Sequence, residues 1–153
     1  ITVSTAGIAK MIRKLADDEV KFNLALSLHA ADDEKRDEIM PINEQNNLAV
    51  IMDAIEYFYQ KTKNKISYEY IAFQNFNDTL VDAANLFKLC NRFPVKVNVI
   101  EYNPIDGAEF EKSSEDRIDL FAQYLRKRNV MITVRRSRGK DIDAACGQLA
   151  NKS

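Results

Sequence analysis

The stretch FNLALSLHAADDEKRDEIM, residues 22–40, contains the unit on which the fold of this chain depends. An apolar run, Phe22–Leu28, ends at His29, the single histidine of the sequence. A polar segment with a helical turn at Glu34–Glu38 follows and stops before Pro41. A short apolar run predicts a buried strand, and a proline ends a helical turn. The stretch therefore predicts a strand followed by a loop and a short helix.

The same unit recurs along the chain. Four further apolar runs predict strands at Ile1–Ser4, Ile66–Phe73, Val95–Tyr102 and Val130–Val134. Segments with apolar residues at helical spacing lie between the runs, and a weaker one covers about Gly7 to Leu15. The runs show little polar alternation, which is typical of parallel strands covered on both faces. This order predicts an α/β fold with a parallel βα repeat, either a doubly wound sheet or part of a β/α barrel.

Capping residues indicate where three of the helices begin. Asn47 and Asp78 are residue types preferred at the N-cap. Ser113, with Asp116 three positions later, resembles a capping box. We therefore expect helices to start directly after Asn47, Asp78 and Ser113.

Composition restricts the class of protein. The 153 residues are 46% hydrophobic and 29% charged, as in globular domains, and no apolar run is long enough to cross a bilayer. The net charge of −1 means that any nucleic-acid contact has to come from a local patch. Two cysteines make no disulfide framework, so we expect a cytoplasmic protein without a membrane partner. The start at Ile1, directly in a strand-like run, suggests a piece of a longer protein.

The glycines indicate which edge of the sheet binds a ligand. All four follow the predicted carboxyl end of a strand, where parallel α/β folds bind their ligands. Five candidate site residues share that edge: Ser4, Ser27, His29, Asn103 and Cys146. His29 alone does not predict a metal site, and neither GxxxxGK[ST] nor GxGxxG is present.

The two cysteines differ in their surroundings. Cys90 continues the helical stripe of Phe87, which favours burial as a small hydrophobic residue. Cys146 stands between small residues in DIDAACGQLA, after the basic run Arg135–Lys140. Nearby arginines favour a thiolate, so a reactive thiol and an ordinary one are both open from the residues alone. No triad partner accompanies it, which disfavours acyl transfer.

Five motifs in order resemble one known family. STAG, SLHAADDEKRDEIMPIN, YNP, RSRG and DIDAACGQL span residues 1–150 and are similar to the C-terminal half of the radical S-adenosylmethionine RNA adenine-C2 methyltransferases, the RlmN family. The resemblance implies that residues 1–153 are a single domain, the C-terminal portion of a radical SAM catalytic domain with a partial β/α barrel. It also implies two cofactors, S-adenosylmethionine and a 4Fe–4S cluster.

The resemblance assigns roles to residues. Cys146 is the catalytic cysteine, methylated first and then attacked by a 5′-deoxyadenosyl radical, so that its methylene carbon reaches C2 of an adenine. Ser4, Ser27, Leu28, His29 and Asn103 match positions that contact S-adenosylmethionine. The implied partners are large-subunit ribosomal RNA, with transfer RNA as a further candidate, and an external electron donor. Arg135, Arg136 and Arg138 are our own candidates for RNA phosphate contacts.

The chain departs from the family in one respect. It has no CxxxCxxC cluster motif, so the cluster ligands lie outside it and the chain alone is expected to be inactive. Two alternatives stay open: a C8-methylating resistance-type relative and a non-catalytic RNA-binding module. A half barrel also leaves Ile1–Ser4 as an edge strand, which predicts self-association through that edge. We expect the inner barrel side chains to include Leu24, Leu26, Val97 and Val99.

Overall fold

Five parallel strands form one sheet in the order of the sequence, β1-β2-β3-β4-β5. The computed structural model describes residues 1–104 and 107–136. The strands are β1 (Thr2–Thr5), β2 (Asn23–Ser27), β3 (Ile66–Ala72), β4 (Lys96–Glu101) and β5 (Met131–Arg135). The helices are α1 (Ala9–Asp17), α2 (Asp33–Ile39), α3 (Leu48–Thr62), α4 (Leu80–Leu89) and α5 (Glu115–Arg126), with a 3₁₀ turn, η1, at Pro41–Glu44. The predicted parallel βα repeat is confirmed.

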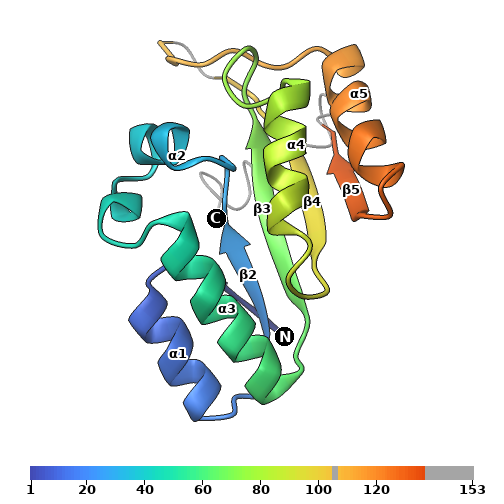
Figure 1. Cartoon of the computed structure of the whole chain (residues 1–153). Helices are drawn as coiled ribbons and strands as arrows, with labels where there is room; N and C mark the ends of the chain where they lie inside the picture. Colours follow the sequence, from blue (N-terminus) through green and yellow to red (C-terminus); the bar gives the residue numbers. More distant parts are fainter. Residues whose placement is uncertain (105–106, 137–153) are drawn as a thin grey trace.

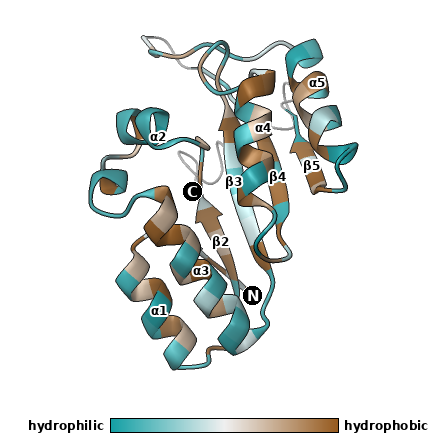
Figure 2. Ribbon diagram, in the orientation of Figure 1, coloured by the Kyte–Doolittle hydropathy of each residue, from teal (hydrophilic) through white to brown (hydrophobic). Residues whose placement is uncertain are grey.

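Helices α1, α3, α4 and α5 lie on one face of the sheet (Figure 1). Sequential strand order with right-handed crossovers places successive helices on the same side, as in a β/α barrel and unlike a doubly wound sheet. The core lies between the helices and this face. Figure 2 shows the hydrophobic residues of α3 and α4 in bands, alternating with hydrophilic residues.

Strands β3 and β4 alternate between buried and partly exposed residues, which differs from the expectation of strands covered on both sides. In β3, Tyr68 and Tyr70 are fully buried, while Ser67 and Glu69 are only partly buried. Side chains of a strand alternate across the sheet, so one face packs against the helices and the other does not. We call the second face the inner face.

The prediction of which side chains point into the barrel was wrong. Leu24, Leu26, Val97 and Val99 are fully buried and belong to the core between sheet and helices. Residues two apart share a face, so their odd-numbered neighbours in β2 and even-numbered neighbours in β4 line the inner face instead. The main hydrophobic core therefore lies on the helix side of the sheet.

Two of the predicted caps lie one residue too early. Asn47 caps α3, and its side chain accepts a hydrogen bond from the amide of Val50, as predicted. Thr79, not Asp78, caps α4 and forms a capping box with Asp82. Ser114, not Ser113, caps α5. The two caps are displaced because Asp78 and Ser113 take part in tertiary contacts.

The two displaced residues bond to each other instead of capping their helices. Ser113 Oγ donates to Asp78 Oδ2 at 2.6 Å, and Arg117 Nη1 donates to Asp78 Oδ1 at 2.9 Å. Both Asp78 and Ser113 are buried. This link ties the loop after β3 to the start of α5.

Strand β1 is an edge strand. It pairs with β2, and its residues are exposed or partly exposed, with Val3 37% exposed. An unpaired strand edge is a template for pairing with another chain. Self-association through this edge stays a prediction.

Candidate functional site

The carboxyl edge of the sheet brings together most of the candidate residues. Ser4 lies opposite Ala25, and Ser27 lies opposite Glu69, so both serines belong to the inner face. His29 lies two residues after the end of β2, and Asn103 follows β4 and is exposed. Cys146 and Arg138 lie outside the described residues.

Leu28 differs from the other candidates because its side chain is fully buried in the core. Its amide donates to the carbonyl of Glu69 at 3.0 Å, and its own carbonyl accepts from Arg36 Nε at 3.0 Å. Both backbone groups are therefore used inside the protein.

Arg36 is a fully buried arginine that joins the ends of β1 and β2. Its Nη2 donates to the carbonyls of Ala6 at 2.7 Å and Ser27 at 2.9 Å, and Nε donates to that of Leu28. Burial lowers the pKa of Arg36 from 12.5 to about 10, against the opposing effect of nearby Asp33 and Asp37. The guanidinium thus holds the backbone around Ser27 and Leu28 in place, directly before His29.

Asn43 holds the guanidinium in place. Its Oδ1 accepts from Arg36 Nη1 at 2.8 Å, and its Nδ2 donates to Asp37 Oδ1 at 2.6 Å and Asp33 Oδ1 at 3.1 Å. The conspicuous SLHAADDEKRDEIMPIN motif is thus largely a structural network around one buried cation. Sequence reasoning missed this role because it predicted a short polar helix here, in which a charged side chain is expected to face solvent.

The turn between β1 and α1 needs a glycine. Gly7 has φ +105°, and a Cβ there would lie 2.8 Å from Ile51 Cδ1 and 3.4 Å from Arg36 Nη2. Its amide donates to Thr5 Oγ1 at 3.1 Å. The glycine lets the end of β1 approach the buried arginine closely.

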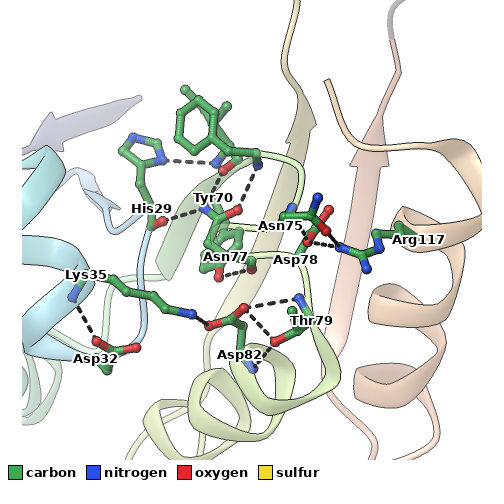
Figure 3. A network of polar contacts seen from close by, with 12 residues as sticks. His29, Asp32, Lys35, Tyr70, Asn75, Asn77, Asp78, Thr79, Asp82 and Arg117 are labelled. Carbon is green, nitrogen blue, oxygen red and sulfur yellow. Dashed lines mark hydrogen bonds and ion pairs between the residues drawn. The ribbon is translucent and has the colours of Figure 1, made fainter. Parts of the chain in front are cut away.

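His29 is held on several sides (Figure 3). It has φ +58°, in the left-handed region, and its Nδ1 accepts a hydrogen bond from the amide of Ile71 at 3.0 Å. Its amide donates to the carbonyl of Glu69 at 3.3 Å. Burial first, and the charge of Arg36 second, lower the pKa of His29 from 6.5 to about 4. The imidazole is therefore neutral at ordinary pH.

Asn77, which sequence reasoning did not single out, supports this histidine. Its side chain is fully buried, and its Nδ2 donates to the carbonyls of His29 and Ile71, both at 2.7 Å. Its Oδ1 accepts from the amide of Phe73 at 2.7 Å, and its own carbonyl accepts from the Tyr70 hydroxyl at 2.6 Å. One amide thus stabilises the ends of both β2 and β3.

A polar layer crosses the inner face at the level of Ser27. The register aligns Ser27, Glu69, Asn98 and Thr133 on four adjacent strands. Thr133 Oγ1 donates to Asn98 Oδ1 at 2.7 Å, and Asn98 Nδ2 donates to Glu69 Oε2 at 2.6 Å. Barrel interiors are commonly filled by branched apolar side chains. The polar residues at alternate positions of SYEY and KVNV were the feature of the sequence that could have predicted this polar layer.

A small cavity of about 330 Å³ opens beside His29. Its other lining residues are Glu38, Ile39, Met40, Phe73, Glu109 and Phe110. Phe73 stacks on Phe110 with ring centroids 4.5 Å apart and meets Tyr102 edge-on at 4.9 Å. The cavity thus combines apolar walls with a few polar groups, as ligand pockets do.

A larger cavity, of about 730 Å³, opens at the amino edge of the strands, where Thr2, Asn23 and Lys96 line it. Parallel β/α folds bind ligands at the carboxyl edge, so position and chemistry favour the cavity beside His29 over the larger one.

The remaining candidates have these positions. Arg135 is exposed at the end of β5, and Arg136 pairs with Asp119 on α5. Cys90 lies at the end of α4, partly buried against the core as predicted, and burial raises the pKa of its thiol from 9.0 to about 12.

Within residues 1–104 and 107–136, no group of three or more His, Cys, Asp or Glu could hold a metal ion. No helix in this part of the chain is long and apolar enough to cross a membrane.

Solved structures define the class of the protein. A radical SAM methyltransferase from Sphaerobacter thermophilus is 38% identical and superposes with a TM-score of 0.88, over 97% of this chain and 43% of that one. SuiB of Streptococcus suis, solved bound to S-adenosylmethionine, shares the fold at 16% identity and a TM-score of 0.64, over 94% of this chain and 34% of that one. The parallel βα repeat is the fold that these radical SAM enzymes share.

Curated relatives give the family. "Probable dual-specificity RNA methyltransferase RlmN" of Cytophaga hutchinsonii is 54% identical over 99% of this chain and 42% of its own length, and that of Flavobacterium johnsoniae is 55% identical over 99% and 44%. "Dual-specificity RNA methyltransferase RlmN" of Campylobacter fetus is 42% identical over 99% and 43%. The chain belongs to the RlmN family. It spans less than half the length of these relatives, and no family model matches it.

Proposed function

We propose that the chain is part of an RNA methyltransferase that takes its methyl group from S-adenosylmethionine. The observation that carries this proposal is the identity of 54% over 99% of the chain to a relative named as a dual-specificity RNA methyltransferase. The 38% identity to a radical SAM methyltransferase supports it from the side of the solved structures. We further propose that residues 1–153 are a single domain, the C-terminal portion of the catalytic domain.

The described residues fit a nucleoside cofactor. Ser4 and Ser27 bring hydroxyls to the inner face, and Glu69 brings a carboxylate to the same layer as Ser27. Hydroxyl and carboxylate groups suit the hydroxyls and the ammonium group of S-adenosylmethionine. When bound, this cofactor supplies the methyl group and the radical that starts its transfer. The part of the chain proposed here is to bind and orient it, with Ser4, Ser27, His29 and Asn103 as contacts.

The 4Fe–4S cluster needs ligands from elsewhere. Iron–sulfur clusters are held by cysteine thiolates, and the cysteine in the described residues, Cys90, is partly buried with a raised pKa. We therefore propose that the cluster ligands lie outside this chain, which would leave the chain inactive alone.

The finer proposal concerns the product. We propose that the target is C2 of adenine in large-subunit ribosomal RNA, with transfer RNA as a second substrate, and that Cys146 carries the methyl group as S-methylcysteine. Its support is the resemblance of the DIDAACGQL motif, which lies outside the described residues. An external electron donor is part of this proposal, and so is a cytoplasmic location.

Mass spectrometry of ribosomal and transfer RNA tests the proposal. A strain without the full gene should lack 2-methyladenosine, and the intact gene should restore it, but a gene with Cys146→Ala should not. Cys90→Ala serves as the matched control and should restore the product. If the gene with Cys146→Ala restored 2-methyladenosine, Cys146 would not be the catalytic cysteine. The appearance of 8-methyladenosine would establish the C8-methylating alternative, and unchanged RNA in the deletion strain would favour the RNA-binding module.

A further inference from the structure

The amino edge of the sheet concentrates positive charge, although the chain as a whole has a net charge of only −1. Three consecutive segments return the chain to β3, β4 and β5 at this edge, at the tails of the strand arrows in Figure 1. Residues 61–65, 91–96 and 126–129 contain three, two and three lysines or arginines, respectively, and no aspartate or glutamate. The segment that returns to β2, residues 17–21, differs, because its sequence DDEVK is acidic. The positive charge is therefore confined to one part of the edge.

The cavity of about 730 Å³ at this edge brings side chains of all three basic segments together. Lys63, Lys65, Lys96 and Arg128 line it, and none of its described lining residues is an aspartate or a glutamate. The cavity beside His29 has the opposite character, because its described lining includes two glutamates and neither lysine nor arginine. We call the larger one the amino-edge cavity. Its electrostatic character suits an anion.

The four cations of the amino-edge cavity are available to a ligand. All four are exposed, and none forms an ion pair with a carboxylate within residues 1–104 and 107–136. Arg92, from the same basic segments, is a contrast: it pairs with Asp53 and Glu56 on α3 and does not line the cavity. The cations that carboxylates of the fold leave unpaired are thus the ones that line the cavity.

Aromatic rings orient two of these cations without neutralising them. Lys63 Nζ lies 5.1 Å from the centroid of the Tyr59 ring, and the guanidinium carbon of Arg128 lies 3.5 Å from that of Tyr124. A cation over a ring keeps its full charge. Arg128 Nη1 also donates to the carbonyl of Tyr124 at 3.0 Å, which further restricts its side chain. Both charges are therefore held at the cavity at a lower entropic cost than on an unsupported side chain.

The rest of the cavity wall supplies apolar and amide groups. Tyr59, Phe87 and Met131 contribute apolar surface, and Met131 is 65% exposed. Asn91 and Asn129 are exposed and add side-chain amides. Lysine, arginine and asparagine side chains bind phosphate and sugar oxygens, and apolar or aromatic surface between them packs against bases. This combination is typical of sites that bind single-stranded nucleic acid without reading its sequence.

We propose that the amino-edge cavity binds a single-stranded stretch of RNA backbone, with Lys63, Lys65, Lys96 and Arg128 as phosphate contacts. A nearly neutral chain needs such a local patch to attract a polyanion. That the bound RNA is the substrate rests on the proposed function; the anion-binding character of the cavity does not.

The position of the cavity defines what this contact does. Strands β3, β4 and β5 have seven, six and five residues. At about 3.3 Å per residue they separate the amino-edge cavity from the carboxyl edge by about 20 Å. RNA bound here lies away from the nucleotide that reacts, so the contact adds affinity and takes no part in the chemistry.

RNA binding by the full-length protein tests the proposal. The probe is a fluorescein-labelled oligouridylate of about 20 nucleotides, followed by fluorescence anisotropy at several salt concentrations. Each phosphate contact to a single strand contributes about 0.7 to the slope of log affinity against log salt, or about fivefold in affinity at about 0.1 M salt. The double variant Lys65→Gln/Lys96→Gln should therefore lower the slope by about 1.4 and the affinity about 25-fold.

Two further variants separate charge at the cavity from charge in general. Lys65→Arg/Lys96→Arg keeps both charges and should retain the affinity and the slope. Lys10→Gln/Lys88→Gln removes the same charge from exposed positions on α1 and α4, outside the cavity, and should change affinity less than about twofold. An unchanged slope in Lys65→Gln/Lys96→Gln, or an equal loss in Lys10→Gln/Lys88→Gln, would overturn the proposal.

Photocrosslinking identifies the ligand and its place. Oligouridylate that contains 4-thiouridine should crosslink to residues of the amino-edge cavity, with Tyr59 and Phe87 as the expected aromatic acceptors. Adducts only at other surfaces would overturn the assignment. The same holds if ATP at micromolar concentration displaces the RNA, because the cavity would then be a site for a free nucleotide.

The two proposals can fail separately. If Lys65→Gln/Lys96→Gln binds RNA as the unaltered protein does, while the intact gene still restores 2-methyladenosine, the RNA site is refuted and the proposed function stands. If the RNA of a deletion strain is unchanged, while the charge variants show the expected slopes, the proposed function is refuted and the RNA site stands.

Discussion

Replacing Arg36 by methionine should cost about 3–5 kcal/mol of the free energy of unfolding. The change removes one donor from each of four acceptors, the carbonyls of Ala6, Ser27 and Leu28 and Asn43 Oδ1, although the Leu28 carbonyl keeps the amide of Ala30 at 2.7 Å. Each buried acceptor that loses its partner costs about 1–3 kcal/mol. Part of this loss is offset because a buried guanidinium is itself unfavourable, as its pKa of about 10 shows. Since a domain has about 5–15 kcal/mol in total, the variant should lie near the limit of folding.

Urea unfolding followed by circular dichroism measures this cost by linear extrapolation. Arg36→Lys, which keeps the charge but not the forked geometry, should fall between the unaltered chain and Arg36→Met and guards against a variant too unstable to measure. Arg13→Met is the matched control, because Arg13 is exposed on α1 over the Tyr57 ring, and it should change stability by less than about 1 kcal/mol. A loss below about 1 kcal/mol in Arg36→Met would refute the role given to the buried guanidinium.

Three further predictions concern stability and metal content. The pKa of His29 is lowered from 6.5 to about 4, so the unfolded chain binds more protons than the folded chain between these pH values. The free energy of unfolding should therefore fall by up to about 3 kcal/mol as the pH drops from 6.5 to 4. When the free energy of unfolding is measured against pH in acid, His29→Gln should show a shallower slope than the unaltered chain, and an equal slope would contradict the lowered pKa. Gly7→Ala should cost about 1–3 kcal/mol more than Gly107→Ala, because both glycines have positive φ but a Cβ meets Ile51 only at Gly7; equal melting temperatures of the two variants would argue against the close approach. Anaerobic reconstitution of this chain should incorporate no 4Fe–4S cluster, as judged by iron and sulfide analysis, and stoichiometric incorporation would show that the ligands are inside it.

The order and type of the elements could be predicted from the sequence because they depend on local patterns. Apolar runs and helical stripes identified five strands and their connecting helices, and the carboxyl edge followed from the parallel arrangement. The two faces of the sheet were not distinguished, because runs such as NLALS alternate only between large and small residues and the polar alternation in SYEY and KVNV was not used.

The supporting networks were not predictable because they join residues far apart in the chain. Arg36 bonds to Ala6, thirty positions away, and Asn77 bonds to His29, forty-eight positions away. The segment DDEKRDE has the pattern of a solvent-exposed helix, and nothing in the local sequence indicates that the side chain of Arg36 is buried. For the same reason Asp78 and Ser113 were predicted to cap helices, although they bond to each other.

The placement of the apolar core on the helix side has a consequence for how this architecture tolerates change. Because the inner face contributes polar side chains and little of the core, whatever fills the lumen can be exchanged without repacking the residues that hold the sheet together. The hydrophobic core thus lies on one side of the five strands, and the ligand binding that we propose lies on the other. Substitutions on the inner face should alter which ligand is accepted at small cost in stability, so this face is where new specificities can arise most easily.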